Sequence, residues 1–178
     1  TDADVQGQIA SSNKDFNKMN SDISAVPIGF RDLASSMNVT FELATTNPDG
    51  FATTGITRKT TAKGALAVET DEVMYSASGG VDAWDPNNYI NIWVCEVGDG
   101  TTLGYATFSS SHGDADDGIV ILYSAFGSGS TANSSYNLGR TLTHEMGHYF
   151  DLYHIWGDDE DDADACGEDD EVSDTPKQ

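Results

Sequence analysis

The sequence predicts an α/β fold of the α+β kind, in which helices pack against a mixed β-sheet. Helical periodicity occurs near the start of the chain and again before the C-terminal region, and short strand patterns lie between the two. That order of elements indicates one mixed sheet with helices against it. The length of 178 residues suits a single domain.

The first predicted element is an amphipathic surface helix over residues 2–20. Its apolar positions are Val5, Ile9, Phe16 and Met19. Alternation of polar and apolar residues predicts a half-buried strand over residues 38–44. Further strands are predicted at residues 89–95, 103–108 and 118–124, the first of them in the interior of the sheet.

A second helix is expected to begin near Tyr136 or Asn137. Leu138, Leu142 and Met146 recur every four residues in it and define a stripe that faces the core. After this helix the chain is predicted to be loop-like.

The formal net charge of -22 is the strongest compositional feature. We expect no nucleic-acid partner, because such binding needs clustered basic residues, and this chain has 8 Lys and Arg against 30 Asp and Glu. No apolar run approaches the ~20 residues that a membrane span requires. The sequence therefore predicts no membrane span.

Acidic residues dominate from Asp158 to Asp174, with no basic residue among them. Such a run is either a solvated segment or a calcium-binding loop, because Ca²⁺ collects carboxylate and carbonyl oxygens from irregular loops. Composition alone leaves both interpretations open.

The two cysteines, Cys95 and Cys166, do not define a disulfide framework. Cys95 lies in an apolar run that predicts a buried strand, where a free cysteine acts as a small hydrophobic residue. We therefore do not expect these two cysteines to form a disulfide.

The segment from Thr141 to His154 carries the chemistry. His144 and His148 are four residues apart on the predicted helix, so both imidazoles project from one face and can share one metal ion. Glu145 follows the first histidine and can reach a water on that metal. His154 can supply a third nitrogen if the chain turns back soon after the helix. Three protein ligands and one water form the open arrangement of a catalytic zinc site.

The alternative is three unrelated histidines. Three of the chain's 4 histidines fall in this short segment at ligand spacing, which favours zinc. His112 lies in a polar, serine-rich connection, and we interpret it as an ordinary surface histidine.

This segment matches the metzincin signature H-E-x-x-H-x-x-G-x-x-H at every defined position except one. More specifically, the chain resembles the pappalysin family of metzincins. The likeness includes Leu-Thr-His-Glu-Met-Gly-His at 142–148 and Leu-Tyr-His at 152–154. It extends to residues 48–50, 54–58, 91–95, 103–108, 117–121 and 174–176, and so covers nearly the whole chain.

The resemblance implies a metzincin-type zincin with an antiparallel edge strand, a backing helix and an active-site helix. Residues 1–150 would form the upper subdomain of the catalytic domain, and residues 151–178 the start of the lower one. It also implies that an extended peptide substrate pairs with the edge strand. The substrate-binding residues would be Gly104, Tyr105, Ala106 and Thr107.

The resemblance further implies secretion and calcium in the acidic segment. The expected calcium ligands are Asp169, Asp170, Asp174 and Thr175, with Asp164 as a further candidate.

Three departures from the family pattern affect these expectations. Asp151 replaces the signature glycine at a sharp turn, but Asp is among the few other residues that adopt the left-handed conformation, so His154 is kept as a ligand. None of the 4 methionines follows His154, although metzincins carry a methionine turn there. Thr1 leads almost directly into the first helix, where the family has a strand. We therefore expect a fragment that lacks most of the lower subdomain, and whose partner is the remaining C-terminal part of the same domain.

The predicted function is that of a secreted zinc metalloendopeptidase acting on proteins or peptides. Zinc-bound water would attack the peptide bond, and Glu145 would accept its proton as general base. The alternative is a non-catalytic module that keeps its metals. A third interpretation is a calcium-dependent adhesion element.

Overall fold

The computed structural model describes residues 1–129, 131–157, 169–173 and 175. Its α-helices and strands in the described residues are α1 (Asp2–Phe16), β1 (Ile92–Cys95), β2 (Gly104–Ala106), β3 (Ile119–Leu122) and α2 (Arg140–Tyr149). Six short 3₁₀ helices accompany them: η1 (Ile23–Ala25), η2 (Ile28–Phe30), η3 (Glu72–Met74), η4 (Ser76–Ser78), η5 (Ser109–Ser111) and η6 (Tyr123–Ala125).

The three strands form a mixed sheet in the order β1-β3-β2. β1 runs parallel to β3 with Ile92 opposite Ile119, and β2 runs antiparallel to β3 with Gly104 opposite Ile121. The central strand β3 is buried on both faces, with Ile119, Val120 and Ile121 at most 1% exposed. The predicted mixed sheet with an antiparallel edge strand is therefore confirmed.

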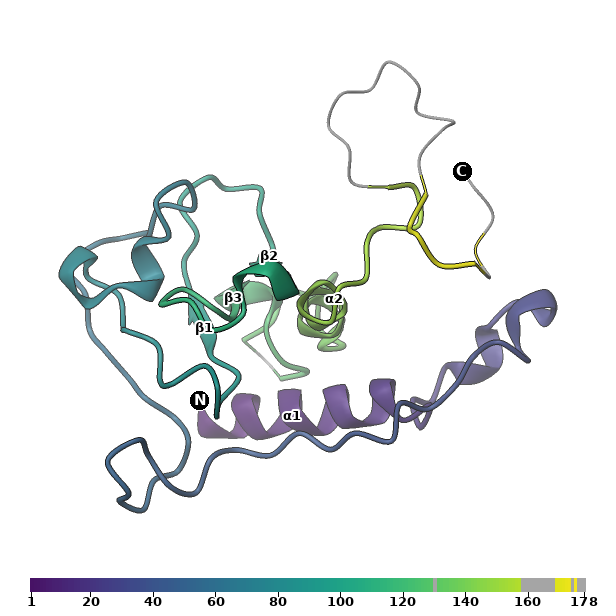
Figure 1. Ribbon diagram of the computed structural model, residues 1–178, viewed down its shortest axis with the longest axis horizontal. Coiled ribbons are helices and arrows are strands. Elements are labelled where there is room, and N and C mark those ends of the chain that lie inside the picture. Colours follow the sequence, from purple (N-terminus) through teal and green to yellow (C-terminus); the bar gives the residue numbers. More distant parts are fainter. Residues whose placement is uncertain (130, 158–168, 174, 176–178) are drawn as a thin grey trace.

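Two hydrophobic clusters cover the two faces of this sheet. Ile119 and Ile121 point towards α2, where they pack with Leu142 and Met146. Val120 points to the opposite face and joins the cluster that contains the 3₁₀ segment η3. In Figure 1, α2 is seen nearly end-on beside the strands, and α1 lies across the bottom of the view. The alternating direction of side chains along β3 thus divides the core into two layers.

Polar as well as apolar side chains hold helix α1 against the rest of the molecule. It begins at a capping box between Thr1 and Asp4, and Gln8 and Ser12 are both fully buried. The Gln8 amide nitrogen donates to the carbonyl of Gly139 at 2.9 Å, and its oxygen accepts from the amide of Gly127 at 2.7 Å. These bonds hold α1 against the chain that leads into α2. The helix ends at Phe16, four residues earlier than predicted.

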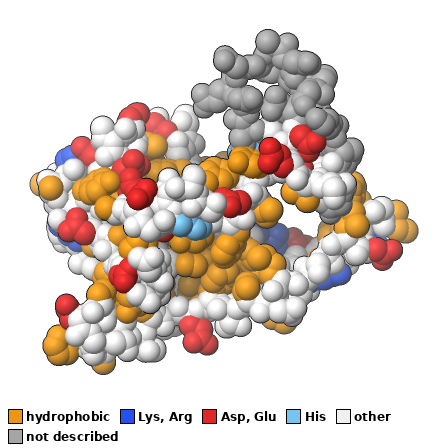
Figure 2. Space-filling view, in the orientation of Figure 1, with side chains coloured by type: hydrophobic (Ala, Val, Ile, Leu, Met, Phe, Trp, Pro, Cys, Tyr) orange, Lys and Arg blue, Asp and Glu red, His pale blue; other side chains and the backbone are white. Residues whose placement is uncertain are grey.

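The strand predicted over residues 38–44 is wrong: this segment pairs with no strand in the described part of the chain, and Asn38 has φ 55°. Its backbone is instead bonded to α1, because Phe41 donates to the side-chain oxygen of Asn13 at 2.8 Å and accepts from its amide at 2.9 Å. A cavity of about 840 Å³ separates this segment from β1. Hydrophobic side chains gather in this region between the sheet and α1 (Figure 2).

Two further predictions are corrected by the structure. β1 was predicted as an interior strand, but among the described strands it lies at one end of the sheet, and β3 is central. Helix α2 begins at Arg140 rather than near Tyr136 or Asn137, because Gly139 precedes it with φ 74°, a left-handed conformation that interrupts a helix. Leu138 is consequently 61% exposed and does not belong to the core stripe.

Candidate metal centre and active site

Helix α2 presents its histidines on the face opposite its core residues. Leu142 and Met146 are at most 1% exposed and fix the helix against the sheet, whereas His144 and His148 point outward. The helix is also tied to α1, because Thr143 donates to Asp15 at 2.9 Å and Arg140 pairs with the same carboxylate at 2.8 Å. The amphipathic pattern of α2 therefore sets the direction in which the two histidines project.

A sharp turn after α2 brings His154 back towards the helix. Asp151 has φ 65°, the left-handed conformation predicted for this position, and its amide donates to the carbonyl of His148 at 2.8 Å. The amide of Leu152 donates to the carbonyl of Gly147 at 2.9 Å. Asp151 is thus able to make the turn in place of the signature glycine.

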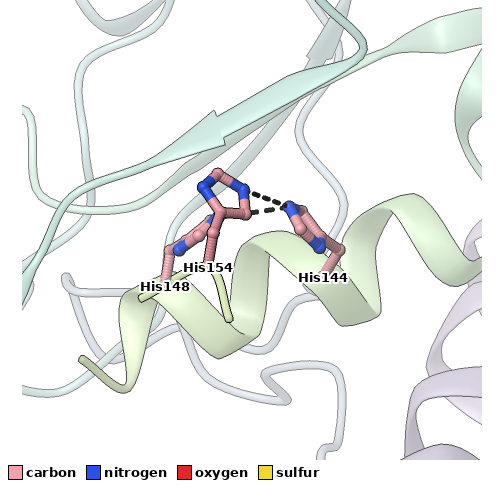
Figure 3. A group of neighbouring side chains, drawn as sticks. All are labelled: His144, His148 and His154. Carbon is pink, nitrogen blue, oxygen red and sulfur yellow. Dashed lines mark hydrogen bonds between the residues drawn. The ribbon is translucent and has the colours of Figure 1, made fainter. Parts of the chain in front are cut away.

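The three histidines converge as the sequence predicted (Figure 3). The Nε2 atom of His144 lies 3.2 Å from the Nε2 atoms of both His148 and His154. Nitrogen atoms that bind one zinc ion tetrahedrally at ~2.0–2.1 Å lie roughly 3.3 Å apart. The spacing and chemistry of these donors therefore fit a single zinc ion.

Neighbouring groups orient the imidazole of His148. Its Nδ1 atom lies 2.7 Å from the carbonyl oxygen of Leu152, and a carbonyl can only accept, so Nδ1 carries the proton and the Nε2 lone pair is available to a metal. Phe108 packs beside this ring, with centroids 5.6 Å apart. The ring of His154 is stacked on Trp156 at 4.8 Å. The sequence did not predict these supporting contacts.

Glu145 lies beneath the edge strand and is only 6% exposed. Burial raises the pKa of Glu145 to about 7, because a buried carboxylate loses its hydration. A bound cation would act in the opposite direction by favouring the ionised form. The side chain thus has a position suited to proton transfer beside the triad.

Gly104 permits the close approach between the edge strand and Glu145. A Cβ atom built at Gly104 would lie 2.9 Å from Cγ of Glu145, and equally close to Cδ1 of Ile121 and the carbonyl oxygen of Val120. Real Cβ atoms are almost never found this close to another heavy atom. The absence of a side chain at Gly104 therefore helps to define where Glu145 lies.

Gly104→Ala is expected to lower kcat about tenfold while zinc remains bound, because the added methyl displaces Glu145 and small misplacements of reacting groups are costly. Peptide-cleavage kinetics and zinc content measure this. Gly64→Ala is a matched control, since nothing lies within 4 Å of its Cβ position. The double variant Gly104→Ala/Ile121→Val relieves the contact of the new methyl with Cδ1 of Ile121 but keeps its contact with Glu145. Recovery of kcat in that double variant would contradict the role assigned to Glu145.

The edge strand offers a free edge to an extended peptide. Leu122 donates to Leu103 at 2.8 Å and Thr107 donates to Gly118 at 3.0 Å, so these positions of the strand face β3. Because antiparallel pairing alternates, the backbone groups of Gly104 and Ala106 point away from β3. No described strand pairs with that edge. The backbone of Tyr105 pairs with Val120 of β3, and its side chain packs on the face of the sheet that points away from α2.

The acidic segment is only partly described. Asp164, Asp174 and Cys166 lie outside the described residues. Asp169 accepts from the amide of Glu171 at 3.1 Å, and the buried Asp170 accepts from the amide of Val172 at 3.0 Å. The amide of Thr175 donates to Val172 at 3.1 Å. Within the described residues, the histidine triad is the one group of three or more His, Cys, Asp or Glu side chains with metal-binding spacing, so calcium stays a prediction.

Cys95 is a half-buried free thiol in the described part of the chain. Burial raises its pKa to about 11, with a smaller contribution from Glu96. The thiol is therefore protonated and unreactive near neutral pH. Whether it pairs with Cys166 stays a matter of prediction.

Comparison with known proteins identifies close structural relatives. The peptidase family model described as Pregnancy-associated plasma protein-A matches residues 74–178. The structure of mature mirolysin from Tannerella forsythia in complex with a cleaved peptide is 44% identical and superposes with a TM-score of 0.93, over 100% of this chain and 65% of that one. The predicted metzincin-type fold is thereby confirmed.

Two relatives in fungi are named extracellular metalloproteases. An extracellular metalloprotease of Podospora anserina is 43% identical over 84 residues, which are 44% of this chain and 26% of the relative. One from Arthroderma otae is 32% identical over 134 residues, which are 72% of this chain and 45% of the relative. The chain therefore spans less than half the length of these two fungal proteins. None of the helices in the described residues has the length and apolar character needed to cross a bilayer.

Proposed function

The chain belongs to the pappalysin family of metallopeptidases, and from this we infer that it is a zinc endopeptidase that hydrolyses protein or peptide substrates outside the cell. One observation carries the proposal: three imidazole nitrogens with the spacing of a tetrahedral zinc site lie beside a buried glutamate. An open three-histidine site next to a carboxylate is the arrangement that metal-assisted hydrolysis requires.

In the proposed mechanism, His144, His148 and His154 hold the zinc ion. When bound, zinc lowers the pKa of a water towards ~7 and polarises the scissile carbonyl. Glu145 accepts the proton of the attacking water and then delivers it to the nitrogen of the leaving amine. Burial keeps this carboxyl group away from competing bulk water.

The edge strand β2 would bind the substrate. An extended peptide can exchange backbone hydrogen bonds with Gly104 and Ala106, whose polar groups face the free edge. Such pairing is independent of the substrate's side chains. It would hold the scissile bond along the strand under which Glu145 lies.

Extracellular location and calcium binding are further parts of the proposal. Location is supported by the names of the two fungal relatives. Calcium is supported by the density of carboxylates after His154, and the proposed ligands remain Asp169, Asp170, Asp174 and Thr175.

The metal requirement can be tested on the purified protein. We expect one zinc ion per chain and cleavage of casein, complete loss of cleavage after removal of zinc with 1,10-phenanthroline, and recovery when zinc is returned. The reason is that zinc would both activate the attacking water and polarise the scissile carbonyl. Zinc binding without cleavage would favour the non-catalytic alternative, and cleavage that persists in metal-free protein would exclude a zinc mechanism.

A further inference from the structure

Asp151 does more than replace glycine in the turn between His148 and His154. Its side-chain Oδ1 atom accepts a hydrogen bond from the backbone amide of Ser109 at 2.8 Å. A glycine would make the same turn without this bond, because it has no acceptor there. The side chain of Asp151 therefore joins two parts of the site that are distant in sequence.

Ser109 lies three residues after the end of β2 and is the first residue of η5. Phe108, just before it, packs beside His148 with ring centroids 5.6 Å apart and stacks on Tyr153 at 5.4 Å. One hydrogen bond and two ring contacts therefore hold the end of the edge strand against the turn that leads to His154. Ser109 and Asp151 both line a hollow of about 360 Å³.

The Asp151 side chain interacts with Ser109 through an acceptor oxygen. Ser109 lowers the pKa of Asp151 below its ordinary value, through its side chain first and its backbone amide second. Ser109 is exposed, so without this bond its amide would be bonded to water. The end of the edge strand would then lose a fixed point relative to the turn.

We propose that Asp151 is a positioning residue for substrate binding, which fixes the end of the edge strand relative to the turn carrying His154. The proposal rests on the proposed function, because the substrate strand is assumed to pair with β2. A preorganised edge binds an extended peptide with less loss of conformational entropy than a mobile one. Asp151 thus acts on peptide affinity through Ser109 and does not touch the reacting atoms.

Two variants separate this role from a purely structural one. Asp151→Gly suits the left-handed turn better than Asp does, so the fold and the triad should persist while the acceptor is lost. We expect KM for a peptide substrate to rise roughly three- to tenfold, as for loss of one hydrogen bond, with kcat within about twofold and zinc content unchanged. Asp151→Asn tolerates the turn and keeps a side-chain oxygen for Ser109, so its KM should stay within about twofold of the parent value.

Amide hydrogen exchange at Ser109 supplies a readout that does not depend on activity. Protection of this amide should disappear in Asp151→Gly and persist in Asp151→Asn. Loss of protection with an unchanged KM would overturn the proposal, as would an equal rise in KM for both variants. If the parent protein proves inactive, affinity for a fluorescent peptide is measured instead. Failure of the proposed function then shows as absent turnover, whereas failure of this proposal shows as equal peptide affinity in the parent and Asp151→Gly.

Discussion

Glu145→Gln is expected to lower kcat by about 10²- to 10⁴-fold, which is the usual contribution of a general base. Gln has nearly the same size and shape as Glu, so it can occupy the space beneath Gly104, but it cannot accept a proton from water. The three histidines are unchanged, and zinc should remain bound in the same ratio. Steady-state kinetics on a peptide substrate, together with metal analysis of the same sample, measure both effects.

The matched control is Glu42→Gln, which makes the same chemical change at an exposed position away from the triad. Its activity should equal that of the parent protein. Activity of Glu145→Gln within threefold of the parent would show that Glu145 is not the base. Loss of zinc from this variant would instead indicate that the substitution disturbs the metal site.

His154→Ala is expected to weaken zinc binding by on the order of 100-fold or more, because loss of a supporting group around a metal ligand already costs ~10- to 100-fold. The two histidines on α2 would remain, but two protein nitrogens leave the ion poorly held. Competition with a chromogenic chelator measures the affinity, and peptide cleavage at saturating zinc measures what activity is left.

His112→Ala is the control for this experiment. His112 is exposed and stacks on Tyr149 with ring centroids 4.4 Å apart, outside the triad. Zinc affinity should be the same as in the parent protein. Equal zinc affinity in His154→Ala would reduce the site to two histidines and would contradict the three-ligand assignment.

The sequence predicts the convergence of the three histidines because the determinants of their placement are local. Four-residue spacing on a helix places His144 and His148 on one face whatever the helix packs against. The return of His154 depends on one backbone conformation at Asp151, which the residue type makes accessible. These features follow from covalent geometry and short-range sterics, so no knowledge of the tertiary structure is needed.

Features that depend on tertiary pairing could not be predicted in the same way. The alternating pattern of residues 38–44 is compatible with a strand, but a strand also needs a partner, and here Asn13 of α1 takes that place. Gln8 is a polar residue of α1, yet it is fully buried, because both the nitrogen and the oxygen of its amide are hydrogen-bonded to backbone groups. The contact between Gly104 and Glu145 depends on the register of β2 against β3, which periodicity does not determine.

The hydrogen bonds of Gln8 also bear on the order in which the molecule folds. They join residues 119 and 131 positions apart in sequence, so most of the chain must be closed into a loop before they form. Closing such a loop costs entropy early, whereas its contacts form only at the end, and proteins rich in distant contacts fold slowly. The docking of α1 against the segment before α2 is therefore expected late in folding.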